Sequence, residues 1–248
     1  VQMSLQDIIN EIKNEGIELP VVIRFQDILR AKVKELNKSF RSAIRNLGYC
    51  GTYKGVYPVK VNQMREVVEE VIESGADYDF GLEAGSKSEL MTILALNTNR
   101  NSLSILNGYK DEHYIRLALI GSKIGRNIVI VVEKPSELDL IIRLAKETKT
   151  RPMIGIRSKL SFKGSGKWEN SAGDKAKFGL STTEIIQAVQ KLKSEHFLDC
   201  LKLFHFHIGS QIPVIGSIQD AITEGARFYA QLVKMGAPLE FFDVGGGL

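Results

Sequence analysis

Short runs of β-branched residues alternate with longer amphipathic segments along most of this chain, and this alternation restricts the fold more than any other feature of the sequence. The run Asn127–Val132, for example, is almost entirely Ile and Val, and the amphipathic segment Ser136–Glu147 follows it after a short loop. A continuous apolar run of this length is typical of a strand covered on both faces, and the segment after it has the period of a helix. Repeated pairs of this kind predict parallel strands joined by crossover helices.

Applied to the whole chain, this reading gives seven strands and eight helices, two of which precede the first strand. The expected strands are Gly55–Val61, Tyr78–Leu82, Ser102–Leu106, Asn127–Val132, Pro152–Ile156, Leu201–His207 and Phe241–Val244. The expected helices are Leu5–Asn14, Gln26–Leu47, Arg65–Glu73, Ser86–Leu96, Glu112–Ile124, Ser136–Glu147, Thr182–Glu195 and Ile218–Met235. Capping signals support several helix starts, such as Ser181 with Glu184 three residues later.

The predicted fold class is α/β, and the arrangement fits a (β/α)₈ TIM barrel better than an open sheet. Eight units are needed to close such a barrel, and about seven are visible. The last residues, Gly245–Leu248, form a glycine-rich segment with no helix after it, so we expect a fragment that stops before the eighth unit. Residues 1–50 are expected to be a helical preface, and residues 51–248 the incomplete barrel.

Composition excludes several other classes of protein. The chain has 33 Lys plus Arg against 29 Asp plus Glu, and its lysines are scattered, so no nucleic-acid footprint is indicated. The longest uncharged stretch, Leu203–Gln219, contains polar residues and Pro and cannot span a bilayer, and the first residues do not form a secretory signal. We therefore expect a cytoplasmic protein without membrane contact. Cys50 and Cys200 have no Cys-x-x-Cys spacing, and we expect both to be buried thiols.

Reactive groups of a barrel lie at the carboxyl ends of its strands and point inward, so alternation along each strand selects candidates. In the first strand this rule places Lys60 inside, near the catalytic end. A lysine there would lose hydration, which is costly unless the amine is neutral, paired or covalently used. A lysine at the sheet edge, or one in a buried ion pair, is the structural alternative.

The sixth and seventh strands carry a second group of candidates. His205 and His207 share the inner face, with His207 nearer the exit, and Ser210 follows, where it is placed to bind a phosphate. No third ligand with zinc spacing accompanies the histidines, so we expect no metal there. Either histidine could be an ordinary core residue, or an imidazole at the mouth could stack on an aromatic ligand. Asp243 points inward just before the run 245–247.

Three consecutive glycines, Gly245, Gly246 and Gly247, form that run. Glycine amides can approach a phosphate closely, and the loop after the seventh strand is a common phosphate site in this barrel class. A flexible turn would have the same sequence, so the location of the run is what favours a binding role.

Three charged residues complete the set of candidates. Glu83, at the end of the second strand, points inward and could tune a lysine, and Glu89 lies on the helix that follows. Their structural alternatives are a helix-cap charge for Glu83 and a solvated helix face for Glu89. Arg157 points inward from the fifth strand, and a long irregular loop, residues 158–178, follows it at the catalytic rim.

Taken together, the lysine, the histidine with its serine and the triple glycine resemble the alanine-racemase-type, fold III pyridoxal-phosphate-dependent decarboxylases. The resemblance covers nearly the whole chain from about Leu19 and points to the arginine-specific branch of the family. The segments that carry it are Val59–Gln63, Gly81–Lys87, Asn107–Asp111, Lys163–Gly166 and His205–Gln211. Ornithine and diaminopimelate decarboxylases share the lysine, histidine and glycine elements, but their sequences differ in the segments that lie between these elements.

The resemblance implies a role for each candidate residue. Lys60 would form a Schiff base with pyridoxal 5′-phosphate (PLP), and His207 would stack on the pyridine ring. Glu83 and Glu89 would be supporting groups near the ring and the lysine. The remaining cofactor-binding positions would be Ser210, the amides of Gly245, Gly246 and Gly247, and Arg157. The implied reaction converts L-arginine to agmatine and CO₂, with the cofactor accepting the released electrons.

Two family elements are missing from this sequence. It contains no Glu-Pro-Gly-Arg motif, whose glutamate would protonate the pyridine nitrogen, and no C-terminal β-domain, which in the family completes the site across a dimer interface. We therefore expect the chain alone to be inactive or nearly so, and its parent to be an enzyme and a homodimer or higher oligomer. A Mg²⁺ requirement is implied by the resemblance only.

Three rival functions stay open at this point. The first is decarboxylation of another basic amino acid, namely ornithine, lysine or diaminopimelate, because nothing in the sequence locates guanidinium recognition. The second is a non-catalytic PLP-binding homologue, although such proteins commonly lose the lysine. The third is a phosphate-binding barrel with aldolase-like chemistry, which would not need His207 opposite a planar cofactor.

Overall fold

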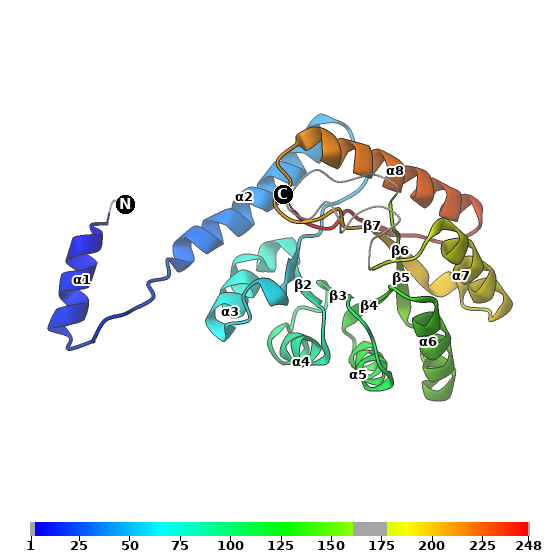
Figure 1. Ribbon diagram of the computed structural model, residues 1–248, viewed down its shortest axis with the longest axis horizontal. Coiled ribbons are helices and arrows are strands. Elements are labelled where there is room, and N and C mark those ends of the chain that lie inside the picture. Colours follow the sequence, from blue (N-terminus) through cyan, green and yellow to red (C-terminus); the bar gives the residue numbers. More distant parts are fainter. Residues whose placement is uncertain (1–2, 161–177, 248) are drawn as a thin grey trace.

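The strands that the structure describes all belong to one parallel sheet, in which they pair in sequence order from β1 to β7. The computed structural model describes residues 3–160 and 178–247. Within them the strands are β1 (Val56–Pro58), β2 (Gly81–Ala84), β3 (Leu103–Leu106), β4 (Asn127–Val132), β5 (Met153–Arg157), β6 (Leu201–His205) and β7 (Phe241–Asp243). Figure 1 shows the sheet curling into part of a barrel, so the predicted incomplete (β/α) barrel is confirmed. In the described part of the chain, β1 and β7 are its two edges.

Helices follow the strands and lie outside the curl of the sheet (Figure 1). They are α3 (Arg65–Ser74), α4 (Lys87–Leu96), α5 (Glu112–Lys123), α6 (Pro135–Thr148), α7 (Thr182–Ser194) and α8 (Ile215–Lys234), preceded by α1 (Leu5–Asn14) and α2 (Gln26–Asn46). The Ser181 hydroxyl and the Glu184 carboxylate form the expected capping box of α7. Among the described helices, none is long and apolar enough to cross a membrane.

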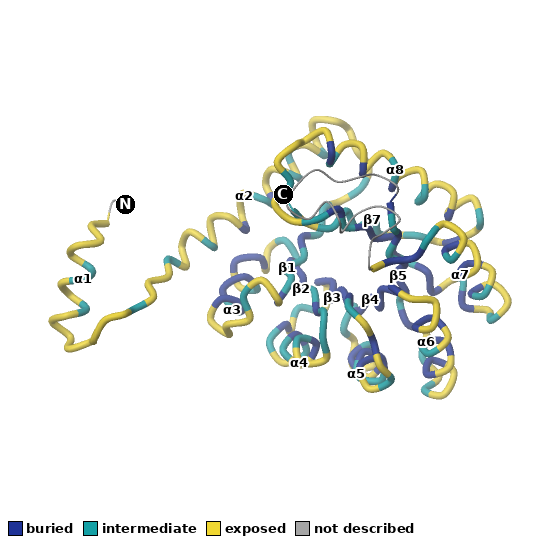
Figure 2. Tube along the Cα trace, viewed as in Figure 1, coloured by how far each residue is buried: buried dark blue, intermediate teal, exposed yellow. Residues whose placement is uncertain are grey.

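Alternation along the strands divides the apolar residues between two cores. On β4, Ile128 and Ile130 belong to the large core between the sheet and the helices, whereas Val129 and Val131 belong to a smaller cluster inside the curl. That inner cluster consists of Leu103, Ile105, Val129, Val131 and Leu203, with Val56, Met153 and Phe241 packed against it. Figure 2 shows the inner strands of the sheet as mostly buried, whereas the residues of the edge strands β1 and β7 are only partly buried. The inner cluster forms an apolar floor, so inward polar groups gather above it, at the carboxyl ends of the strands.

Three strands have bounds that differ by two or more residues from the sequence prediction. The sixth strand ends at His205 instead of His207, so His207 lies in the loop that follows β6. The first strand ends at Pro58, and Val59–Val61 form a short 3₁₀ turn, η1, instead of continuing the strand. A proline has no N–H for a ladder bond, which helps to explain why the pairing stops there. The second strand begins only at Gly81, because Ala76–Tyr78 form another 3₁₀ turn, η2, and Asp79 adopts a left-handed conformation with φ 52°.

The N-terminal helices make few contacts with the sheet. No residue of α1 is buried, and Figure 1 shows α1 and the start of α2 reaching away from the strands. Further along, Val33 of α2 packs with Val71 of α3 and with Phe80. A domain boundary at residue 50 stays a prediction from the sequence.

One cysteine prediction is wrong. Cys200 is buried in the short turn before β6, and burial raises the pKa of its thiol to about 11. Cys50 is exposed, because it lies in the segment between α2 and β1 and not in an element that packs on the core. The expected rim loop lies almost wholly in residues 161–177, outside the described part.

Candidate active site

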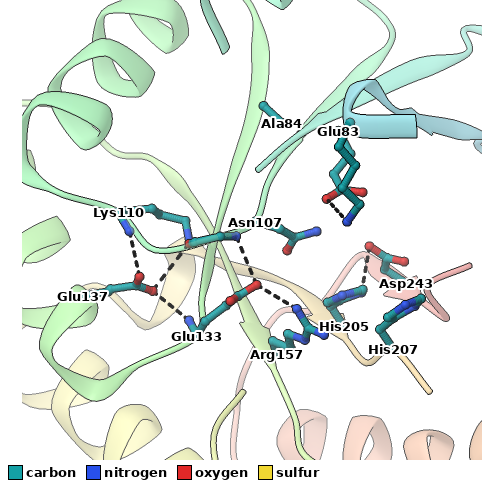
Figure 3. Close-up of polar contacts among 12 residues, drawn as sticks. Glu83, Ala84, Asn107, Lys110, Glu133, Glu137, Arg157, His205, His207 and Asp243 are labelled. Atoms are coloured by element: carbon teal, nitrogen blue, oxygen red, sulfur yellow. Dashed lines mark hydrogen bonds and ion pairs between the residues drawn. The ribbon is translucent and has the colours of Figure 1, made fainter. Parts of the chain in front are cut away.

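A layer of polar side chains sits above the apolar floor, at the carboxyl ends of six neighbouring strands (Figure 3). On β3 and β4 these side chains come two residues after an inner-core position, as Asn107 does after Ile105 and Glu133 after Val131. The same alternation therefore governs both layers. The layer consists of Glu83, Asn107, Glu133, Arg157, His205 and Asp243.

Lys60 reaches this layer from η1. Its Nζ lies 3.5 Å from Oε1 of Glu83 on β2, while the side chain of Lys60 is 62% exposed and that of Glu83 is 15% exposed. The expected loss of hydration at Lys60 is therefore wrong for the described structure, because the 3₁₀ turn lifts the amine to the open mouth. The lysine nevertheless keeps a carboxylate partner, because Glu83 lies within ion-pair distance of its amine.

His207 and the glycine run are in direct contact. Nδ1 of His207 accepts the N–H of Gly246 at 3.3 Å. Burial, together with the positive charges of Arg157 and Lys60, lowers the pKa of His207 to about 4. The imidazole is therefore neutral near pH 7 and can serve as an acceptor.

A second histidine lies deeper, beside Asp243. Nδ1 of His205 is 3.0 Å from Oδ2 of Asp243, an ion-pair distance, although the ring is not aligned for a hydrogen bond. Oδ1 of Asp243 accepts the N–H of Gly245 at 2.9 Å. Burial raises the pKa of Asp243, but His205 and this N–H outweigh burial and lower it overall. Asp243 thus links the end of β6 to the start of the glycine run.

Gly245 has a local reason to be glycine. It has φ 71°, and a Cβ at this position would lie 2.6 Å from the carbonyl oxygen of Phe206 and 2.8 Å from Nδ1 of His207. A Cβ on Gly247, which has φ 101°, would overlap the carbonyl of Gly209, whereas one on Gly246 would meet nothing within 4 Å. The backbone of the run therefore approaches the loop after β6 as closely as only glycine permits.

Ser210 lies exposed in that loop, with no contact that fixes its hydroxyl among the described residues. The loop is nevertheless held to the glycine run, because the N–H of Ile212 donates to the carbonyl of Gly247 at 3.0 Å. The two segments expected to bind phosphate are thus adjacent in space.

Glu89 acts as a helix cap. Its Oε2 accepts the N–H of Gly85 at 2.8 Å and its Oε1 accepts the hydroxyl of Ser86 at 3.1 Å, at the start of α4. Sequence reasoning assigned the cap alternative to Glu83 and a solvated face to Glu89, and both assignments are wrong. Nothing in these contacts places Glu89 on a cofactor ring.

Sequence reasoning missed a buried charged cluster behind Arg157. Oε1 of Glu133 accepts two hydrogen bonds, one from Nη1 of Arg157 at 2.9 Å and one from the N–H of Gly108 at 3.2 Å. Burial raises the pKa of Glu133, but the charges of Arg157 and Lys110 outweigh it and hold the pKa below its ordinary value. Glu137 joins Lys110 to the backbone of Glu133. The signal was available, because Asn107 and Glu133 continue the inward alternation one residue past the predicted strand ends.

The site suits a flat, anionic ligand. Oδ1 of Asn107 and Oε2 of Glu133 are buried without a partner in the described structure, so the layer contains acceptors that a bound group could satisfy. Beside them are an amine, a neutral imidazole and a glycine run that has no room for a Cβ at Gly245 or Gly247. These groups match the aldehyde, ring and phosphate of PLP. No cluster of three or more His, Cys, Asp or Glu suited to a metal occurs in the described ranges.

A parallel barrel with a lysine, a histidine and a glycine loop at the carboxyl ends of its strands defines the class of PLP-binding barrels. Residues 31–248 match the family model for the pyridoxal-binding domain of pyridoxal-dependent decarboxylases. The chain belongs to this family.

Individual relatives agree with this assignment. The biosynthetic arginine decarboxylase of Phocaeicola vulgatus is 48% identical over 248 residues, and that of Prochlorococcus marinus strain AS9601 is 48% identical over 247 residues. These matches cover all of this chain but only 39% and 38% of the relatives. The chain thus spans well under half the length of the curated relatives that it matches.

Solved structures show the same fold. The biosynthetic arginine decarboxylase from Campylobacter jejuni superposes with a TM-score of 0.89 at 36% identity, over 98% of this chain and 39% of that one. Diaminopimelate decarboxylase from Helicobacter pylori, complexed with L-lysine, gives a TM-score of 0.71 over 88% of this chain and 52% of that one. Its identity of 23% supports the fold alone.

Proposed function

We propose that the protein containing this chain decarboxylates L-arginine to agmatine and CO₂ with PLP as cofactor. One observation carries the proposal: a single end of the barrel brings the Lys60–Glu83 pair together with His207 and the run 245–247. The arginine decarboxylases that match at 46–48% identity over the whole chain support arginine as the substrate. They favour it over ornithine, lysine and diaminopimelate.

Each residue has a role that follows from its place. Lys60 would hold the cofactor covalently through Nζ, and Oε1 of Glu83, 3.5 Å away, is placed to take or return a proton at that nitrogen. His207 would stack on the ring in its neutral form. PLP, when bound, supplies the electron sink that makes loss of CO₂ feasible. The protein supplies placement and charge.

Phosphate binding is assigned to the paired loops after β6 and β7. The amides of the glycine run and the hydroxyl of Ser210 would bind the phosphate, and Ile212 keeps the loops together. Two of the amides already have acceptors, since Gly245 donates to Asp243 and Gly246 to His207. A phosphate would have to share or replace those acceptors.

A direct test uses the natural protein that contains this sequence, at whatever length it is encoded. Incubation with PLP and L-arginine should release agmatine and CO₂ in equal amounts, and Lys60→Ala should abolish both. Parallel incubations contain ornithine, lysine or diaminopimelate. Faster CO₂ release from one of these would reassign the substrate, and PLP binding without CO₂ from any of them would favour a non-catalytic homologue.

We also propose that the protein is a cytoplasmic homo-oligomer, on the strength of the family resemblance. Light scattering of the purified natural protein tests the oligomeric state, and cell fractionation tests the location. A Mg²⁺ requirement is tested by assaying activity with and without a chelator.

A further inference from the structure

The largely buried pair formed by Arg157 and Glu133 lies next to the proposed cofactor site. Their side chains are 16% and 1% exposed, and Nη1 of Arg157 donates to Oε1 of Glu133 at 2.9 Å. A guanidinium stays charged in proteins, so burying one requires a counter-charge. Glu133 supplies that charge from the residue directly after β4.

The backbone on both sides holds Glu133 in place. Its carboxylate accepts the N–H of Gly108, and its own N–H donates to Oε2 of Glu137 at 2.8 Å. Oε1 of Glu137 accepts the N–H of Lys110 at 3.0 Å, and Nζ of Lys110 donates to the carbonyl of Gly108 at 2.6 Å. The loops after β3 and β4 thus form one bonded unit, and Glu133 is its member that faces the barrel interior (Figure 3).

Arg157 faces the site from this support. Its guanidinium carbon lies 5.4 Å from the centre of the Phe178 ring, and its charge contributes to the lowered pKa of His207. A guanidinium has five N–H donors in one plane, and the bond to Glu133 engages Nη1 only. The bond to Glu133 fixes one edge of the Arg157 guanidinium, and the Phe178 ring lies nearby. Together they set the direction of the remaining N–H donors of Arg157.

We propose that Glu133 is a positioning residue, which holds the guanidinium of Arg157 so that Arg157 donates to an oxygen of the bound pyridoxal cofactor. This inference rests on the proposed function, since it requires PLP at this end of the barrel. It differs from a purely structural role, in which Glu133 would only neutralise a buried arginine and stabilise the fold.

PLP titration of the natural protein that contains this chain, and of its variants, separates the two roles. The readouts are the dissociation constant for PLP and the absorbance band of the lysine-bound cofactor, followed across pH. We expect Glu133→Gln to weaken PLP binding about tenfold, in proportion to the loss of one charge-assisted hydrogen bond, and to change the pH dependence of the band. Glu133→Asp keeps the charge and should recover part of the affinity for PLP. If Glu133→Gln does not fold, Glu133→Asp is the variant whose PLP affinity is compared with that of the natural sequence.

A double-mutant cycle gives the decisive comparison. If Glu133 acts through Arg157, Glu133→Gln should weaken PLP binding in the natural background but should have no further effect in an Arg157→Gln background. Equal weakening in both backgrounds, or unchanged binding in the single variant, would overturn the inference. If the protein with its natural sequence shows no absorbance band of lysine-bound PLP, that result contradicts the proposed function, and this inference with it.

Glu70 offers a matched control. It is also a buried carboxylate paired with an arginine, because it accepts Nε and Nη2 of Arg30 at 2.7 and 2.9 Å, but it lies between α2 and α3, away from the site. Glu70→Gln should lower the melting temperature and leave PLP affinity and the band unchanged. A change in PLP affinity as large as that of Glu133→Gln would show that loss of any buried carboxylate has this effect, and would overturn the positioning role.

Discussion

Nδ1 of His207 accepts the N–H of Gly246, so the loop after β6 and the glycine run after β7 are joined by a bond that exists only with an unprotonated imidazole. Burial, helped by the positive charges of Arg157 and Lys60, keeps the ring in that form by lowering its pKa to about 4. The geometry of the proposed phosphate site therefore depends on the charge state of one side chain.

A pH dependence of stability follows from this relationship. The unfolded chain takes up a proton at His207 near pH 6.5, whereas the folded chain does so only near pH 4. Between these values the unfolded state binds more protons, so the free energy of unfolding should fall as the pH falls from 6.5 to 4. Urea titrations across this range should give a shallower decline for His207→Gln. Equal declines for the two proteins would contradict the buried neutral imidazole.

Gly245 and Gly246 should respond differently to the same substitution. Gly245→Ala introduces a Cβ at φ 71° against Phe206 and His207, so we expect a loss of about 1–3 kcal/mol in stability together with weaker PLP binding. Gly246→Ala meets open space and should be neutral or stabilising by up to about 1 kcal/mol. Thermal melts of both variants test this contrast. Similar losses at the two positions would show that the close approach at Gly245 is not what matters.

The buried hydroxyl of Tyr114 joins the loops after β2 and β3. It donates to the carbonyl of Ala84 at 2.9 Å, and burial raises the pKa of Tyr114, so it stays protonated. Tyr114→Phe should cost about 1 kcal/mol, because the carbonyl of Ala84 keeps its bond from the N–H of Asn107. As a control, Tyr229→Phe removes a half-buried bond to the carbonyl of Leu239 and should cost less. Chemical denaturation measures both, and a cost for Tyr114→Phe no larger than for the control would contradict the account.

The sequence predicted the fold well because the signal is repeated. Each βα unit has the same alternation of a buried run and an amphipathic segment, so an error of up to three residues at a boundary, such as a predicted start of α8 at Ile218 instead of Ile215, leaves the topology unchanged. The barrel class depends only on the number and direction of the units.

The site was harder to predict, because it depends on residues where the strands stop being regular. Lys60 lies on a 3₁₀ turn that no alternation rule anticipates, and its exposure follows from that turn. Glu133 was missed since it lies one residue beyond the expected strand end. Glu83 and Glu89 could not be told apart by sequence, because capping is decided by which carboxylate reaches the free amides of α4.

The most direct test of the central claim is to find which lysine binds PLP. The chain is incubated with PLP, reduced with borohydride, digested and analysed by mass spectrometry, with Lys60→Ala in parallel and exposed Lys87 as an internal control. The account predicts a single reduced pyridoxyl adduct on Lys60 in the natural sequence and none in the variant. An adduct on Lys87 or Lys110 with Lys60 unmodified would contradict it.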